Sequence, residues 1–315
     1  MSATATGGVV PGFAHEAFFY RGDTEFVDGV LAFVREGLDR GETVVVAEPR
    51  ARLESLRHAL AEDAGAVQFL DMADVGANPG RIIAVWHAAL EEAVAAGRQL
   101  RGVGEPAYRG RRPQEMDECH VHELLLNRAF DGGPPWRLLC PYDTGHLPAS
   151  VTDRAVLSHP EWSSLATRGR TGSDIQQSLA DTFAGTMAPP TAPALRGEFT
   201  AVDVPAVRRT VASWARRCGL PEDRVEVLEL AASELATNSI RHGGGGGSIA
   251  LWEDADAAVV EFSDGGRVAD PLAGRLPPAP DDEGCSGLYL LHQLCDLVQL
   301  RSTPIGTTVR VITWR

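Results

Sequence analysis

The first half of the chain alternates amphipathic helical patterns with short apolar runs. Phe26, Val30 and Phe33 recur at helical spacing, and residues 43–47 then form a β-branched run with no polar alternation, which is typical of a fully buried strand. The same alternation continues with a helix at 53–60, a strand at 67–70, a helix at 81–96, a strand at 100–103, a helix at 120–130 and a strand at 136–140. Successive units of this kind predict an α/β domain with a mostly parallel sheet and helices on both faces.

The second half follows a different order of elements. It predicts, in turn, a strand at 198–202, helices at 205–217 and 221–240, strands at 248–252 and 257–263, a helix at 287–296 and strands at 298–301 and 307–314. The two middle strands are separated only by a short turn-like segment, which favours a hairpin. This order predicts an antiparallel or mixed sheet with helices on one face.

A change in composition separates the two patterns. Between residues 169 and 196 the chain is rich in Gly, Ser, Thr, Ala and Pro. A short helix at 175–183 fits the sequence, but the prolines after it favour an extended linker. We therefore expect two domains, 1–168 and 197–315, joined by a Gly/Pro-rich linker at 169–196.

Net charge and composition exclude several functions. The formal net charge is −14 at pH 7, whereas binding a nucleic-acid backbone normally needs clustered positive charge, so we expect no nucleic-acid partner. The chain has no lysine, which excludes a Walker A lysine, a lysine Schiff base and a lysine general base. No apolar stretch approaches the ~18 residues of a membrane span, and residues 1–11 do not resemble a secretory signal. This predicts a cytoplasmic protein without membrane attachment.

The cysteines indicate neither a disulfide framework nor a complete metal site. They are five in number and lack paired spacing, so we expect reduced thiols. Cys119, His120 and His122 form the metal-like cluster of the sequence, but a structural zinc site takes four ligands and no second pair lies nearby in the sequence. We therefore expect these residues to be polar positions on a helix with one face toward a cleft.

In the second half, Glu234 and Asn238 lie one turn apart on a predicted helix, so their side chains project from the same face. Asn is a poor helix former and needs a reason to be there. One interpretation is a solvent-exposed polar face, although Leu235 and Ile240 leave only a narrow polar stripe. The other is that Asn238 offers an oxygen ligand to Mg²⁺ while Glu234 orients or deprotonates a nucleophile.

Two glycine-containing segments add to this pair. Asp264 ends a predicted strand and precedes Gly265 and Gly266. A carboxylate there can accept a hydrogen bond from an adenine amino group, and the glycines let the backbone approach the ring. Gly284 and Gly287 enter a predicted helix, where free N–H groups and the helix dipole favour phosphate.

The order and spacing of these segments resemble the N, G1 and G2 boxes of the GHKL ATPase superfamily. The resemblance covers about 197–315 and rests on Ser233-Glu234-Leu235-Ala236-Thr237-Asn238-Ser239-Ile240-Arg241-His242-Gly243, Asp264-x-Gly266, Gly284-x-x-Gly287-Leu288 and Gly306-Thr307-Thr308. Within the superfamily, the segments look most like the anti-sigma-factor serine kinases that phosphorylate STAS-domain antagonists.

The resemblance implies a GHKL (Bergerat) α/β sandwich that binds ATP and Mg²⁺. It makes Glu234 the catalytic base and Asn238 the Mg²⁺ ligand. The nucleotide contacts that it implies are Asn238, His242, Asp264 to the adenine, Gly266, Gly284, Gly287 to phosphate, Leu288, and Thr307 or Thr308 in support of the base. The implied partner is a sigma factor, a STAS-domain antagonist, or both.

Two departures from the family pattern keep an alternative open. Val268 stands where the G1 box usually has its second glycine, and Cys285-Ser286 replace the usual small-basic pair before Gly287. They favour a non-catalytic switch in which ATP only sets the shape of a partner-binding surface. A histidine kinase is less favoured, because such enzymes carry a helical hairpin with a phosphoacceptor His where this chain has its Pro-rich linker.

The first half resembles the MEDS sensory domain, also called DcmR-like, over about 13–162. The resemblance rests on His15-Glu16, Gly104-Glu105-Pro106, Cys119-x-x-His122-Glu123-x-x-x-Asn127, Leu139-Cys140-Pro141-Tyr142-Asp143 and His159-Pro160. It implies a RecA-like fold without a Walker A loop and a small organic ligand, with His15, Glu105, Glu123 and Tyr142 as candidate pocket residues. The alternative for each residue is a structural hydrogen bond. A homodimer is compatible with this organisation.

Overall fold

The protein forms two compact units. A computed structural model describes residues 12–278 and 286–315. The N-terminal unit contains the chain up to residue 76 and residues 85–178, and the C-terminal unit contains residues 77–84 and 179–315. Among the described residues, no helix is long and apolar enough to cross a lipid bilayer.

The N-terminal unit is built on a seven-stranded sheet with the order β3-β2-β4-β5-β1-β6-β7. The strands are β1 (Phe13–Tyr20), β2 (Thr43–Glu48), β3 (Val67–Asp71), β4 (Leu100–Gly104), β5 (Trp136–Asp143), β6 (Glu161–Ser163) and β7 (Arg168–Arg170). All pairings are parallel except that of β6 with β7. The predicted mostly parallel sheet is therefore confirmed.

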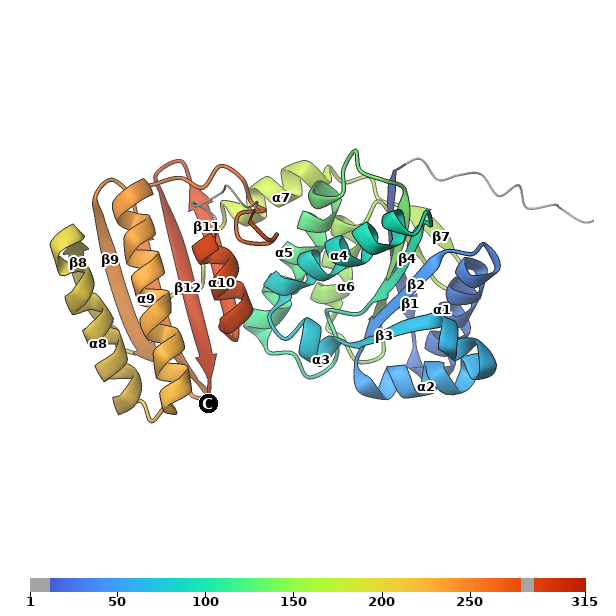
Figure 1. The fold of residues 1–315 in the computed structure, drawn as a ribbon, viewed down its shortest axis with the longest axis horizontal. Coiled ribbons are helices and arrows are strands. Elements are labelled where there is room, and N and C mark those ends of the chain that lie inside the picture. The colour runs from blue at the N-terminus through green and yellow to red at the C-terminus, as the bar shows by residue number, and fades with distance from the viewer. Residues whose placement is uncertain (1–11, 279–285) are drawn as a thin grey trace, which may run out of the picture. The chain divides into compact units, whose positions relative to one another are not determined.

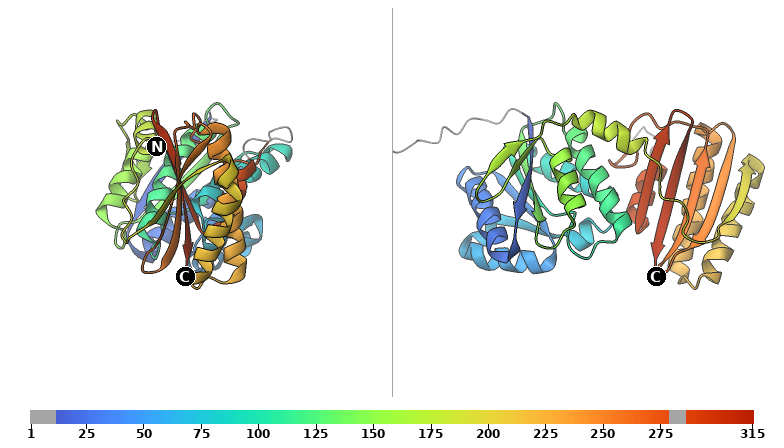
Figure 2. Two further views of the ribbon diagram at one scale, coloured as in Figure 1. Left: turned by 90° about the vertical axis from the view of Figure 1, so that its left-hand side faces the viewer. Right: turned by 180° about the vertical axis from the view of Figure 1, so that it is seen from behind.

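Helices flank this sheet (Figures 1 and 2). They are α1 (Gly22–Asp39), α2 (Arg50–Leu60), α3 (Met72–Val75), α4 (Ile82–Ala95), α5 (Pro113–Ala129) and α6 (Ala149–Ser158), with a short 3₁₀ helix at Ala61–Ala66. A second 3₁₀ helix, Pro79–Arg81, lies in the segment 77–84 that belongs to the C-terminal unit. The β-branched run of β2 is buried, as its lack of polar alternation predicts. The sequence pattern did not indicate β1, although this strand lies between β5 and β6.

The C-terminal unit is a five-stranded antiparallel sheet with the order β11-β12-β10-β9-β8. Its strands are β8 (Leu195–Thr200), β9 (Gly246–Glu253), β10 (Ala257–Asp264), β11 (Leu297–Thr303) and β12 (Gly306–Trp314). The helices α8 (Val204–Arg217), α9 (Glu222–His242) and α10 (Ser286–Leu294) lie on one face of this sheet (Figure 1), and a 3₁₀ turn (Ala201–Asp203) precedes α8. The expected antiparallel or mixed sheet with helices on one face is confirmed.

Helix α9 occupies the centre of the helical layer. It begins with the acidic residues Glu222 and Asp223 and ends with Arg241 and His242, an arrangement that complements the helix dipole. Its apolar side chains, among them Leu228 and Leu235, join a core that also contains residues of α8 and of β10 to β12. This packing fixes the face of α9 that turns toward the end of β10.

The segment predicted to be a linker, 169–196, is only partly irregular. It contains α7 (Ile175–Phe183), in which Leu179 and Phe183 are buried. Phe183 belongs to the hydrophobic core of the C-terminal unit. Helix or strand structure is absent only from 171–174 and 184–194, so the extended stretch after the helix is shorter than the composition indicates.

Candidate functional site

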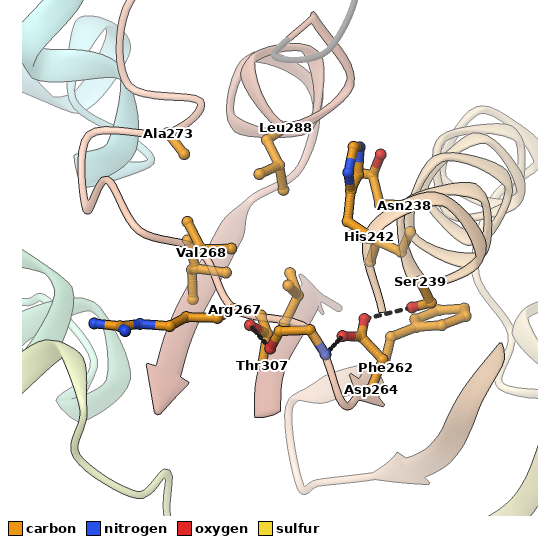
Figure 3. A pocket seen from close by; sticks show the side chains of 14 residues that line it. Asn238, Ser239, His242, Phe262, Asp264, Arg267, Val268, Ala273, Leu288 and Thr307 are labelled. Atoms are coloured by element: carbon orange, nitrogen blue, oxygen red, sulfur yellow. Dashed lines mark hydrogen bonds between the residues drawn. The ribbon is translucent and has the colours of Figure 1, made fainter. Parts of the chain in front are cut away.

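A cavity of about 280 Å³ opens in the C-terminal unit between α9, the end of β10, β12 and the loop after β10 (Figure 3). The residues that line it are Leu235, Asn238, Ser239, His242, Phe262, Asp264, Gly266, Arg267, Val268, Ala273, Leu288, Leu300, Thr307 and Val309. Most of this wall is apolar, and Ser239 and Asp264 form a hydrogen-bonded pair within it. Such a combination suits a flat, partly polar ligand.

One face of α9 forms a wall of the cavity. Leu235, Asn238, Ser239 and His242 follow one another at the three- and four-residue steps that align side chains on a helix. Figure 3 shows Asn238 and His242 side by side on this wall. The face therefore presents an amide, a hydroxyl and an imidazole toward the same space.

Asp264 is held by two hydrogen bonds. Its Oδ2 accepts from the Ser239 hydroxyl at 2.7 Å, and its Oδ1 accepts from the Gly266 backbone N–H at 2.8 Å. The Thr307 hydroxyl donates to the Gly266 carbonyl oxygen at 2.9 Å, which fixes the turn after β10. Each carboxylate oxygen retains a further lone pair, so a donor in the cavity can still bind Asp264.

Glycines allow the chain to close around Asp264. A Cβ atom on Gly266 would lie 2.3 Å from the His242 carbonyl oxygen, and one on Gly243 would lie 2.4 Å from the Asp264 Cγ. Both contacts are far shorter than van der Waals separation. The end of α9 and the turn after β10 therefore approach each other at a distance that only glycine permits.

We expect Gly266→Ala to lower the free energy of unfolding of the C-terminal unit by about 1–3 kcal/mol, because the added methyl group meets backbone atoms that cannot rotate away. Gly265→Ala is the matched control, since a Cβ there would first meet the Gly243 carbonyl oxygen at 3.5 Å. Denaturant unfolding of both variants measures the difference. Equal stability of the two variants would contradict the close approach.

Glu234 lies outside the cavity lining, one turn before Asn238. Its carboxylate packs against the beginning of α10, where a Cβ on Gly287 would come within 2.5 Å of the Glu234 Oε2. Glu234 is half-buried. The glycine therefore leaves room for the carboxylate beside the first turn of α10.

The structure brings most of the sequence-predicted residues together. Asn238, His242, Asp264, Gly266, Leu288 and Thr307 line the cavity. Thr308 instead pairs with Ser263, its hydroxyl lying 3.0 Å from the Ser263 hydroxyl, and is not among the lining residues. Gly284 and Cys285 lie outside the described residues.

Sequence reasoning missed several lining residues, above all Ser239, which anchors Asp264. Its position one turn after Leu235 on the same face was a usable signal. Phe262 and Val309 could have been found by strand alternation from Asp264 and Thr307. Val268, which departs from the family pattern, lines the cavity and donates its backbone N–H to the Ser302 hydroxyl at 2.9 Å.

In the N-terminal unit, the four predicted sensor residues separate into two groups. Glu123 joins His15 and Tyr142: its Oε2 is 3.0 Å from the His15 Nε2, and its Oε1 accepts from the Tyr142 hydroxyl at 3.1 Å. Burial lowers the pKa of His15 to about 4. Glu105 lies elsewhere, where its Oε1 accepts from the Tyr20 hydroxyl at 2.9 Å.

The Cys119-His120-His122 cluster of the sequence is a set of polar positions on α5. Cys119 is buried and donates its thiol to the Pro106 carbonyl oxygen at 3.2 Å. His122 is buried and His120 only half-buried. Within the described residues, the group of donor atoms close enough to hold a metal ion does not include any of these three.

Glu105 shares its surroundings with a second buried carboxyl group, that of Glu48 at the end of β2. Burial raises the pKa of Glu105 to about 7. Burial and the neighbouring Glu105 carboxyl raise the pKa of Glu48 well above its ordinary value. Glu48 is the last residue of β2, and Glu105 directly follows β4, so both lie at the carboxyl ends of parallel strands. This pair is therefore a candidate functional position in the N-terminal unit.

We expect the N-terminal unit to lose stability as the pH rises from about 4.5 to above about 7. The pKa of Glu105 is higher in the folded than in the unfolded state, so the folded state holds this proton more tightly. The stability that the bound proton contributes to the folded unit is lost when Glu105 is deprotonated. Glu105→Gln should therefore be more stable than wild type by about 3 kcal/mol at pH 8, and by only a small fraction of that at pH 5. Urea unfolding at both pH values, with the exposed Glu54→Gln as control, checks this. A pH-independent difference would contradict it.

Family models match both units. The MEthanogen/methylotroph, DcmR Sensory domain (MEDS) matches residues 14–160, and the histidine kinase-like ATPase domain matches residues 198–313. The chain thus joins a MEDS sensory domain to a histidine kinase-like ATPase domain. The serine-protein kinase RsbW of Halalkalibacterium halodurans is 34% identical over 120 residues, which cover 34% of this chain and 70% of that protein. The chain belongs to the family of ATPase-domain proteins that includes this kinase.

A solved structure is similar to part of the chain. It is the crystal structure of the RsbU and RsbW domains of Rv1364c from Mycobacterium tuberculosis, at 18% identity and a TM-score of 0.31. The similarity covers 39% of this chain and 32% of the chain in that structure, so it spans about a third of the length of that chain.

Proposed function

We propose that this signalling regulator is an ATP-dependent serine/threonine protein kinase of the anti-sigma type, controlled by its MEDS domain. The observation that carries the proposal is Asp264, which is held by Ser239 and Gly266 at the wall of a mostly apolar cavity. Asn238 lies on the same cavity wall and Glu234 one turn before it. In this proposal Asp264 binds the adenine base, Asn238 binds the metal ion and Glu234 accepts a proton.

The cavity fits an adenine base. The amino group of adenine can donate to the free lone pairs of Asp264, while Val268, Leu300 and Val309 offer apolar surface to the ring faces. The Thr307 hydroxyl holds the turn that positions Asp264. A purine with an acceptor in place of the amino group would face the carboxylate unfavourably.

The phosphates and the metal would lie on the side of Asn238 and α10. Asn238 offers the hard oxygen that Mg²⁺ prefers, and the metal, when bound, neutralises charge on the phosphates. The first turn of α10 presents backbone N–H groups, and Gly287 keeps that turn free of a side chain. The His242 ring, which also lines the cavity, can add a hydrogen-bond donor.

Glu234 would act on the acceptor. Its carboxylate lies beside the beginning of α10, so it can take the proton of a serine or threonine hydroxyl that approaches the terminal phosphate. As the chain belongs to the family of the serine-protein kinase RsbW, we propose a sigma factor or a STAS-domain antagonist as the protein partner.

A non-catalytic switch is the second candidate, because Val268 stands in the cavity wall where the family pattern has glycine. A phosphotransfer assay separates the two functions: full-length protein is incubated with radiolabelled ATP and STAS-domain proteins from the same genome. The kinase proposal predicts label on serine or threonine of at least one of them. Nucleotide binding without transfer to any of them would favour the switch.

The MEDS domain is proposed to regulate the ATPase domain, with a small organic ligand near Glu105, Glu123 or Tyr142. Couplings between sites typically amount to ~1–3 kcal/mol and are reciprocal, so ATP must also act on the sensor. Hydrogen exchange of residues 13–163 in full-length protein, with and without ATP and Mg²⁺, tests this without knowledge of the ligand. Identical exchange in both conditions would argue against regulation by this domain.

A further inference from the structure

Four metal-ligating side chains meet in the interior of the N-terminal unit. His15 lies in β1, Glu123 in α5 and Cys140 in β5, and His159 directly follows α6. Each of the four residues is at most 1% exposed. One donor atom from each lies within 4.8 Å of all the others. The proposed phosphotransfer chemistry uses none of them, and Glu123 is also one of the residues near which the sensor ligand is proposed to bind.

The spacing of the donor atoms fits a tetrahedron. The Glu123 Oε2 is 3.0 Å from the His15 Nε2 and 3.3 Å from the His159 Nε2. The Cys140 Sγ is 3.4 Å from the His15 Nε2 and 3.6 Å from the Glu123 Oε2. A tetrahedral site with metal–ligand bonds of ~2.0–2.3 Å has ligand–ligand separations of ~3.3–3.8 Å. The four groups are therefore already close to the arrangement that a metal ion requires.

Hydrogen bonds at the Nδ1 atoms of His15 and His159 orient the two rings, so that their Nε2 atoms face the space between the four donor atoms. The Asn127 amide nitrogen donates to the Glu123 and Ser158 carbonyl oxygens at 3.0 and 2.8 Å, which leaves its Oδ1 facing the His15 Nδ1 at 3.2 Å. His15 Nδ1 is therefore the protonated nitrogen. The His159 Nδ1 is 2.8 Å from the Ala155 carbonyl oxygen, which can only accept. In its neutral form, each ring thus presents a lone pair at Nε2.

Without a cation, these lone pairs would meet other acceptors. The His15 and His159 Nε2 atoms both face a carboxylate oxygen of Glu123, and the His159 Nε2 has no hydrogen-bond partner in the described part of the chain. Buried acceptors that face one another are unfavourable unless a proton or a metal lies between them. The Tyr142 hydroxyl donates to the other Glu123 oxygen, as groups around metal-bound carboxylates commonly do.

We propose that His15, Glu123, Cys140 and His159 bind one divalent zinc ion. Two imidazoles, a thiolate and a carboxylate are ligands that zinc accepts in tetrahedral geometry, and four protein ligands in a buried position make a closed site. On binding, the Cys140 thiol gives its proton to solvent and its sulfur bonds to the ion. The ion fixes β1 and β5 to α5 and α6.

The metal content of untagged full-length protein tests the proposal directly. We expect about one zinc ion per chain, and X-ray absorption should show a four-coordinate zinc with sulfur among its neighbours. Replacement by Co²⁺ should give the visible bands of a tetrahedral site together with a thiolate-to-cobalt charge-transfer band. Both measurements use the wild-type chain and do not depend on ATP binding or phosphotransfer.

Two cysteine variants locate the site. Cys140→Ser should lose the charge-transfer band, whereas Cys119→Ser should keep it, because Cys119 is a buried thiol of the same unit that bonds to the Pro106 carbonyl oxygen instead. The proposal would be overturned if folded wild-type protein retained no zinc after incubation with micromolar zinc. A proton shared between the Glu123 carboxylate and the histidine rings would then take the place of the metal. A zinc site without sulfur, or a band that persists in Cys140→Ser, would also overturn the proposal.

Discussion

Glu234→Gln is expected to lower the rate of phosphotransfer to a protein hydroxyl by about 10²–10⁴-fold, the usual effect of removing a general base. Glutamine has nearly the same shape, so it retains the packing of residue 234 against Gly287 at the beginning of α10. It cannot take a proton. The affinity for ATP should change little, because Glu234 does not line the cavity. Single-turnover transfer from radiolabelled ATP, with affinity measured in parallel, separates the two effects.

The control for this variant is Glu226→Gln, which removes an exposed carboxylate from the same helix. It should transfer phosphate at the wild-type rate. A Glu234→Gln protein that is equally active would show that the carboxylate has no part in proton transfer. A loss of ATP binding equal to the loss of transfer would place Glu234 in the nucleotide site instead.

Asp264→Asn is expected to weaken ATP binding by about 1.5–3 kcal/mol, or about 10- to 150-fold, through loss of a charge-assisted hydrogen bond. Asparagine can keep both internal contacts, since its oxygen can accept from the Gly266 N–H and its amide can donate to the Ser239 hydroxyl. What changes is the group offered to the base, because an amide donor then competes with the amino group of adenine. Calorimetry of the full-length protein measures the difference.

Asp223→Asn serves as the control, because Asp223 is an exposed carboxylate at the start of α9, far along the helix from the cavity wall. It removes the same charge without touching the cavity, so its affinity for ATP should equal that of wild type. If Asp264→Asn also binds ATP as tightly as wild type, the adenine does not contact Asp264 and the orientation of the nucleotide in the cavity is wrong.

The C-terminal unit was largely predictable because its signals are local. Helix α9 has an apolar stripe, an acidic first turn and a glycine directly after its end, and its observed range is close to the predicted one. The predicted site residues lie in short segments whose order in the sequence resembles a known pattern. Ser239 was missed because its role depends on Asp264, which lies 25 residues later and meets it only after folding.

The N-terminal unit was harder to predict because its polar residues meet through topology. Strand β1 contains the buried His15 beside Glu16, so its pattern of alternation is broken and the strand was not expected. His15 and Cys140 are 125 residues apart, and they meet because β1 and β5 pair in parallel. The family resemblance grouped Glu105 with His15, but Glu105 directly follows the end of β4, whereas His15 lies near the start of β1.

The cavity beside Asp264 is proposed to be an adenine nucleotide site. Isothermal titration of the full-length protein with ATP and Mg²⁺, followed by the same titration with GTP, tests it most directly. We predict saturable binding of one ATP per chain and clearly weaker binding of GTP, because the guanine oxygen would face the Asp264 carboxylate. Absence of saturable ATP binding, or GTP binding as tight as that of ATP, would contradict it.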